Sequence, residues 1–85
     1  MRLTLKYFAS LREALGPGGT LEWAPAGEPT AAALRAWLRT QSAAHAQALA
    51  PGRAVRVAVD QALADEAAPL SEGAEVAFFP PVTGG

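Results

Sequence analysis

The sequence contains no cysteine and a single histidine, His45. The absence of cysteine excludes a disulfide scaffold, a thiolate nucleophile and a zinc site built on cysteine. Charge is also sparse, because Asp, Glu, Lys and Arg make up 18% of the residues and the formal net charge is -1. A protein that binds nucleic acid through bulk electrostatics is strongly basic, so this function class is excluded.

Long apolar runs are missing too. The longest uncharged run, 40–52, contains several polar residues and is shorter than the ~20 apolar residues of a membrane-spanning helix. The N-terminal segment alternates and contains Lys6, whereas a signal peptide has a continuous apolar core. We therefore expect one small cytoplasmic domain that makes no contact with a membrane.

Hydrophobic periodicity predicts the order β, short helix, β, long helix, β, short β, β. Residues 2–8 and 75–79 alternate with period two and are the two best strand candidates. Further strands are expected at 20–24, 53–59 and 62–64. This order predicts an α+β domain with one main helix over one face of a mixed sheet. Parallel pairing of the first and last strands would make it a β-grasp, an assignment that rests on fold-level analogy.

The two helices carry terminal signals. Ser10 and Glu13 have the spacing of a capping box, and Gly16 follows as a stop. Thr30 is expected to cap the main helix, and the helical region is expected to end at Pro51.

One face of the main helix is expected to be buried through Leu34, Trp37 and Leu38, at positions i, i+3 and i+4. Arg35 and Arg39 lie one turn apart on a different face, and we expect both in solvent.

Side chains for a self-contained enzyme are scarce. Asp65 and Glu66 are adjacent, but their polar loop offers no burial that would separate two carboxyl pKa values. His45 lies among small residues and is expected to be a surface or half-buried helical histidine. From Asp60 onward there are five acidic residues and no Lys or Arg. Two interpretations of that segregation stay open: acids in solvated loops, or an acidic end that attracts a basic partner.

The chain ends in Phe79-Pro80-Pro81-Val82-Thr83-Gly84-Gly85. Pro80 and Pro81 stop the last strand and favour an extended exit. The final glycines have no Cβ atoms, so this thread can enter a narrow channel and present its carboxylate there. The reactive group would then be the terminus itself; the alternative is a frayed polar terminus.

Three segments, Tyr7 to Glu13, Ala58 to Gln61 and Glu75 to Gly85, resemble the small subunits of molybdopterin synthase. Asp60 stands where this family usually has Asn. The resemblance spans the full length and implies one ubiquitin-like β-grasp sulfur carrier, residues 1–85, with a flexible tail at 80–85.

The resemblance also implies a chemistry at Gly85. A ubiquitin-activating-like adenylyltransferase uses ATP and Mg²⁺ to convert the C-terminal carboxylate to an acyl-adenylate, and a sulfur donor protein then leaves a thiocarboxylate. The sulfur is passed to cyclic pyranopterin monophosphate to form the molybdopterin dithiolene. Gly84, Thr83, Pro81 and Pro80 provide tail access, and the chain is a sulfur-donor subunit that itself holds no cofactor or metal.

The resemblance implies three partners: the large subunit of molybdopterin synthase, with which the chain would form a heterotetramer, the adenylyltransferase and the sulfur donor protein. It implies no binding to nucleic acid or to a membrane. Strand parity places Phe8 and Phe79 on the sheet face away from the helix, where Leu63 can join them as a partner interface. The alternatives are a sulfur carrier for thiamine synthesis or tRNA thiolation, and a non-reactive ubiquitin-like binding module.

Overall fold

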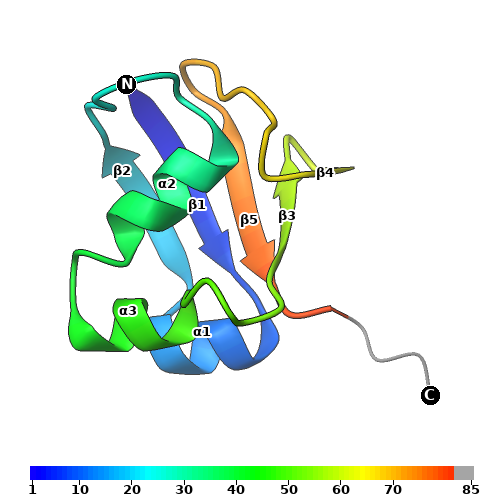
Figure 1. The fold of residues 1–85 in the computed structure, drawn as a ribbon. Helices are drawn as coiled ribbons and strands as arrows, with labels where there is room; N and C mark the ends of the chain where they lie inside the picture. The colour runs from blue at the N-terminus through cyan, green and yellow to red at the C-terminus, as the bar shows by residue number, and fades with distance from the viewer. Residues whose placement is uncertain (82–85) are drawn as a thin grey trace.

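A computed structural model describes residues 1–81 of the chain. Strands and helices alternate along the first half, and three strands follow the last helix (Figure 1). The elements are β1 (Arg2–Tyr7), α1 (Ala9–Leu15), β2 (Gly18–Glu22), α2 (Ala31–Leu38), α3 (Ala43–Ala48), β3 (Arg56–Val59), β4 (Ala62–Ala64) and β5 (Glu75–Phe79).

The strands form one mixed sheet in the order β2-β1-β5-β3-β4. The first and last strands are parallel neighbours at its centre, with Leu5 opposite Val76 and Tyr7 opposite Phe78. The other pairings are antiparallel. The parallel pairing at the centre confirms the α+β prediction and its β-grasp arrangement.

The core lies between the sheet and the helices that cover one of its faces (Figure 1). Period-two alternation sends every second side chain of β1 and β5 inward, and these residues are buried as expected. Burial of each large apolar side chain contributes about 1.5–3 kcal/mol. The buried set includes Leu3, Leu5, Tyr7, Val76 and Phe78 from the central strands, Leu34, Leu38 and Leu49 from the helical side, and Leu70 from the last connection.

The capping-box prediction for the first helix was wrong. The N-cap is Phe8, which makes no side-chain cap bond, and the helix already includes Ala9 and Ser10. The N–H groups of Leu11 and Arg12 both donate to the Phe8 carbonyl, so the helix starts directly from the end of the strand. The predicted stop was correct, because Gly16 is the C-cap, with φ 86°.

The single long helix predicted between Thr30 and Pro51 is divided into two helices, α2 and α3. Thr30 caps α2 as predicted, since its hydroxyl accepts from the Ala33 N–H at 3.1 Å. The chain then turns at residues 39–42, where the Thr40 hydroxyl donates to the Trp37 carbonyl at 2.6 Å. Ser42 starts α3 by accepting from the His45 N–H at 3.1 Å. Short polar side chains that bond to nearby backbone groups favour such breaks and caps.

Several strand boundaries differ from prediction: β1 ends at Tyr7 instead of Phe8, and β2 spans Gly18–Glu22 instead of 20–24. β2 begins at Gly18, where φ is +97° and a Cβ would collide with the Leu5 carbonyl, so only glycine fits this approach. β3 begins at Arg56 instead of Arg53, because the Arg53 carbonyl accepts a hydrogen bond from Arg35.

In the part of the chain that the structure describes, no helix has the length and apolar character needed to cross a bilayer.

Candidate functional site

The C-terminal tail leaves the sheet from the end where β1 and β5 both finish (Figure 1). Pro80 and Pro81 follow β5 directly, are half-buried and have no regular secondary structure, as the sequence predicted. Thr83, Gly84 and Gly85 lie outside the described residues. The described part of the site is therefore the end of the sheet from which the tail starts.

Beside this exit, one sheet face is free of helices and carries apolar side chains. Phe8 is 44% exposed and Leu63 is 68% exposed, while Phe79 is half-buried. The Phe8 N–H donates to the Phe78 carbonyl at 3.2 Å, which extends the parallel register and places Phe8 next to Phe79. The strand parity that predicted a shared open face for these residues is confirmed.

Small residues connect the two aromatic side chains to Leu63. Ala58 lies opposite Ala77 on one side and opposite Leu63 on the other. A row of apolar positions therefore crosses β4, β3 and β5 toward the tail exit. We call Phe8, Ala58, Leu63 and Phe79 the open-face strip; Ala77, which lies between them in the register, is only 6% exposed.

Two other titratable side chains, Tyr7 and His45, are buried or half-buried in the fold. Tyr7 is 2% exposed and its hydroxyl has no hydrogen-bond partner among the described residues. Burial raises the pKa of Tyr7 to about 12, so the hydroxyl stays protonated at neutral pH. His45 is half-buried, as expected, with Nδ1 at 2.7 Å from the Ser42 hydroxyl. Residues 1–81 contain no group of His, Asp and Glu side chains that could hold a metal ion.

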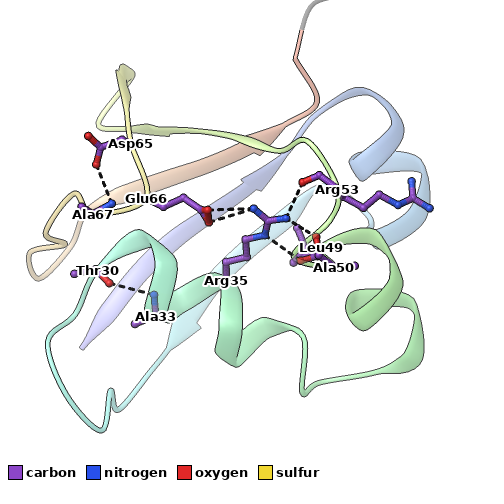
Figure 2. A network of polar contacts seen from close by, with 9 residues as sticks. All are labelled: Thr30, Ala33, Arg35, Leu49, Ala50, Arg53, Asp65, Glu66 and Ala67. Atoms are coloured by element: carbon purple, nitrogen blue, oxygen red, sulfur yellow. Dashed lines mark hydrogen bonds and ion pairs between the residues drawn. The ribbon is translucent and has the colours of Figure 1, made fainter.

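The prediction that Arg35 lies in solvent was wrong. Its side chain is buried and uses all of its nitrogens (Figure 2). The guanidinium donates to the Glu66 carboxylate and to three backbone carbonyls, which is the planar multiple recognition that arginine favours. The contacts are Nη1 to Glu66 Oε1 at 3.1 Å and Oε2 at 3.2 Å, Nε to Leu49 O at 2.9 Å, and Nη2 to Ala50 O at 2.6 Å and Arg53 O at 3.0 Å.

This network, which we call the Arg35 clamp, holds both ends of the β3–β4 hairpin. The carbonyls at 49, 50 and 53 belong to the connection before β3, and Glu66 follows β4. The Ala32 N–H also donates to the Glu66 carbonyl at 2.8 Å, at the start of α2. The clamp therefore fixes the hairpin that carries Leu63 and Ala58 against α2.

The sequence offered a signal for this burial. The buried positions of α2 are Ala31, Leu34, Arg35 and Leu38, a regular i, i+3, i+4, i+7 stripe. Trp37, predicted to lie on the buried stripe, is only half-buried. Starting the stripe at Ala31 would have placed Arg35 on it.

The two neighbouring acids also have structural roles. Glu66 is held by Arg35, and Asp65 Oδ1 accepts from the Ala67 N–H at 2.8 Å, as Figure 2 shows. Each carboxylate therefore makes a bond that holds the local fold. The described residues thus supply a scaffold and an open sheet face beside the tail.

A mixed sheet with parallel first and last strands, helices on one face and a tail leaving from the last strand defines a ubiquitin-like β-grasp domain. Structural neighbours support this class. The chain belongs to the ThiS family, whose sequence model matches residues 5–85.

Three similar proteins show how close the similarity is in sequence and in structure. The molybdopterin synthase sulfur carrier subunit of Escherichia coli is 46% identical over 79 residues, which cover 93% of this chain and 94% of that protein. The solution structure of the Haloferax volcanii HVO 2177 protein is 28% identical with a TM-score of 0.75, and the match covers 100% of this chain and 87% of that one. One chain of the complex of subunits 1 and 2 of the molybdopterin-converting factor from Helicobacter pylori matches at 22% identity and a TM-score of 0.67, over 100% of both chains. At this identity, the match supports the fold alone.

Proposed function

We propose that this chain is the sulfur carrier subunit of a molybdopterin synthase. The observation that carries the proposal is the 46% identity, over 93% of the chain, to a relative with this name. The family match extends through Gly84 and Gly85 to residue 85, so the tail is part of the family pattern. The sequence contains no cysteine, and the described residues include no group of His, Asp and Glu side chains that could hold a metal ion.

A carboxylate is a poor electrophile, so the Gly85 carboxylate must be activated before it can take up sulfur. An oxygen of the Gly85 carboxylate attacks the α-phosphorus of ATP, bound with Mg²⁺ on an adenylyltransferase, and pyrophosphate leaves. Sulfide-level sulfur (HS⁻) supplied by a donor protein then attacks the acyl carbon and AMP leaves, so one carboxylate oxygen departs with AMP. The product is a thiocarboxylate, a soft anionic nucleophile that is available without cysteine.

In the transfer step, the thiocarboxylate sulfur attacks a side-chain carbon of the cyclic pyranopterin monophosphate on the large subunit and displaces an oxygen substituent, which leaves as phosphate oxygen or water. The sulfur stays on the pterin and the acyl carbon takes an oxygen from water, which regenerates the Gly85 carboxylate. Gly84 and Thr83 give the terminus a narrow profile, and Pro81 and Pro80 direct it away from the sheet. We place this chemistry in the cytoplasm.

Intact-mass spectrometry tests the proposed function. With ATP, Mg²⁺ and the cognate adenylyltransferase, the mass should first increase by one adenylyl group. Addition of the sulfur donor should convert it to the mass in which sulfur replaces one oxygen. An unchanged mass under both conditions would support a non-reactive binding module instead.

We also propose that the open-face strip contacts the large subunit and the adenylyltransferase, since apolar groups clustered near the exit fit the core of an interface. Phe79→Glu should weaken both complexes by about 2 kcal/mol or more if Phe79 is a hot spot, measured by titration calorimetry. Phe8→Glu should act in the same direction, because Phe8 is the exposed neighbour of Phe79.

The matched control is Phe78→Glu, one residue away on the same strand. Phe78 is 1% exposed, so this variant buries a charge and should unfold. Phe79→Glu should retain most of the thermal stability, because that side chain is only half-buried on the open face. Undiminished binding by Phe79→Glu, or unfolding equal to that of Phe78→Glu, would contradict the interface.

A further inference from the structure

All five acidic side chains between residues 60 and 75 are bonded within the chain. Three accept hydrogen bonds from backbone N–H groups, and two pair with cationic side chains. The bonds are Asp60 Oδ1 to Glu75 N at 3.0 Å, Asp65 Oδ1 to Ala67 N at 2.8 Å, Glu72 Oε2 to Arg2 N at 2.8 Å, Glu66 to Arg35 at 3.1 Å, and Glu75 to Lys6 at 3.1 Å.

Several of these acids also lie far from the tail. Asp60 and Glu72 flank the start of β5, and Glu75 is its first residue. β5 runs from this end of the sheet to Phe79 at the other, as Figure 1 shows. Of the two interpretations of the acidic segment, the structure favours acids that stabilise loops over an acidic docking surface at the tail.

The tail end of the sheet carries positive charge that the described residues do not neutralise. Arg56 lies directly opposite Phe79 in the β3–β5 register. Arg53, three residues earlier, uses its carbonyl in the Arg35 clamp, while its side chain points away from the clamp (Figure 2). Both side chains are exposed, and within residues 1–81 neither guanidinium has an ion pair or a hydrogen bond. We call Arg53 and Arg56 the tail-end arginines.

The neighbourhood of these arginines suits a protein partner. Arg53 borders a groove of about 150 Å³ that is otherwise lined by α1 and α3, and Arg56 adjoins the open-face strip through Phe79. An apolar patch with a charged border is the usual composition of a protein interface. A nucleic acid is disfavoured because the chain as a whole carries a formal net charge of -1.

We propose that the tail-end arginines dock onto a carboxylate-rich surface of the large subunit, beside the channel that receives the tail. This inference rests on the proposed function and specifies the chemistry of that partner. Exposed charges at the border of an interface act mainly on the association rate. The arginines would attract the partner, bring the tail to its channel and leave the open-face strip to make the apolar contact.

The test is the association rate of the full chain with the large subunit, measured by stopped flow at several salt concentrations. The double variant Arg53→Glu/Arg56→Glu should associate about tenfold more slowly at low salt, because steering becomes repulsion. The rates of variant and wild type should converge near 1 M salt, where the Debye length falls to about 3 Å.

A charge-matched control separates position from net charge. Arg2→Glu/Arg39→Glu makes the same charge change away from the tail exit and should alter the association rate by less than about twofold. Equal slowing in both double variants, or none in Arg53→Glu/Arg56→Glu, would overturn the inference. The inference would also be overturned if the wild type bound a single-stranded oligonucleotide and Arg53→Glu/Arg56→Glu lost that binding.

The same samples separate this inference from the proposed function. Both arginine variants keep Gly85, so intact mass should still report adenylate and thiocarboxylate formation. Normal thiocarboxylation with unchanged association would leave the sulfur carrier function standing and remove the docking role. A wild-type chain that neither forms a thiocarboxylate nor binds the large subunit would remove both.

Discussion

Deletion of Gly85 should abolish molybdopterin formation while leaving the fold intact. The proposed reaction occurs at the carboxylate of Gly85, and a chain shortened by one residue presents that group one position too far from the channel. Addition of one residue after Gly85 should have the same effect by moving the carboxylate outward. Conversion of the pyranopterin precursor, measured with the large subunit and the sulfurated carrier, should fall to background in both variants.

Thermal unfolding provides the control for the two tail variants. The core is built from residues 3–78, so the midpoint should change little when a residue beyond Pro81 is removed or added. Molybdopterin formation by the shortened chain would show that the terminus is not the reagent. A large fall in the midpoint would mean that the tail contributes to the fold.

Arg35→Met should lower the free energy of unfolding by about 3 kcal/mol or more. The variant leaves three backbone carbonyls without their donor and Glu66 without its cation, and an unsatisfied buried polar group costs about 1–3 kcal/mol. For a domain of this size, the midpoint of thermal unfolding should fall by more than ~10 °C. Chemical denaturation with urea measures the free energy directly.

Arg39→Met is the matched control on the same helical segment. Arg39 is half-buried and its guanidinium makes no hydrogen bond or ion pair within residues 1–81, so the loss should be about 0.5 kcal/mol or less. Glu66→Gln keeps an acceptor but removes the charge, and it should fall between the two because the Glu66 side chain is 43% exposed. Equal stability of Arg35→Met and Arg39→Met would mean that the clamp does not stabilise the fold.

Local sequence signals were sufficient where one segment decides its own structure. Alternation in residues 2–8 and 75–79 predicted both central strands and their inward faces, with only Phe8 falling outside the observed strand, because period two is a property of the extended backbone. The Thr30 cap and the Gly16 stop were also local, since each depends on bonds to nearby residues. The capping box failed because Phe8, not Ser10, occupies the position before the helix.

By itself, the sequence determined the strand parity, the absence of cysteine and the Gly84-Gly85 motif on which the proposed chemistry rests. Only the tertiary structure decided the environment of Arg35, because its partners are 14 to 31 residues away in the chain. The tertiary structure also decided how charge is distributed over the sheet. Antiparallel pairing of β3 with β5 places Arg56 beside Phe79 and Val59 beside Val76, so arginines and acids that are neighbours in sequence lie at opposite ends of the sheet.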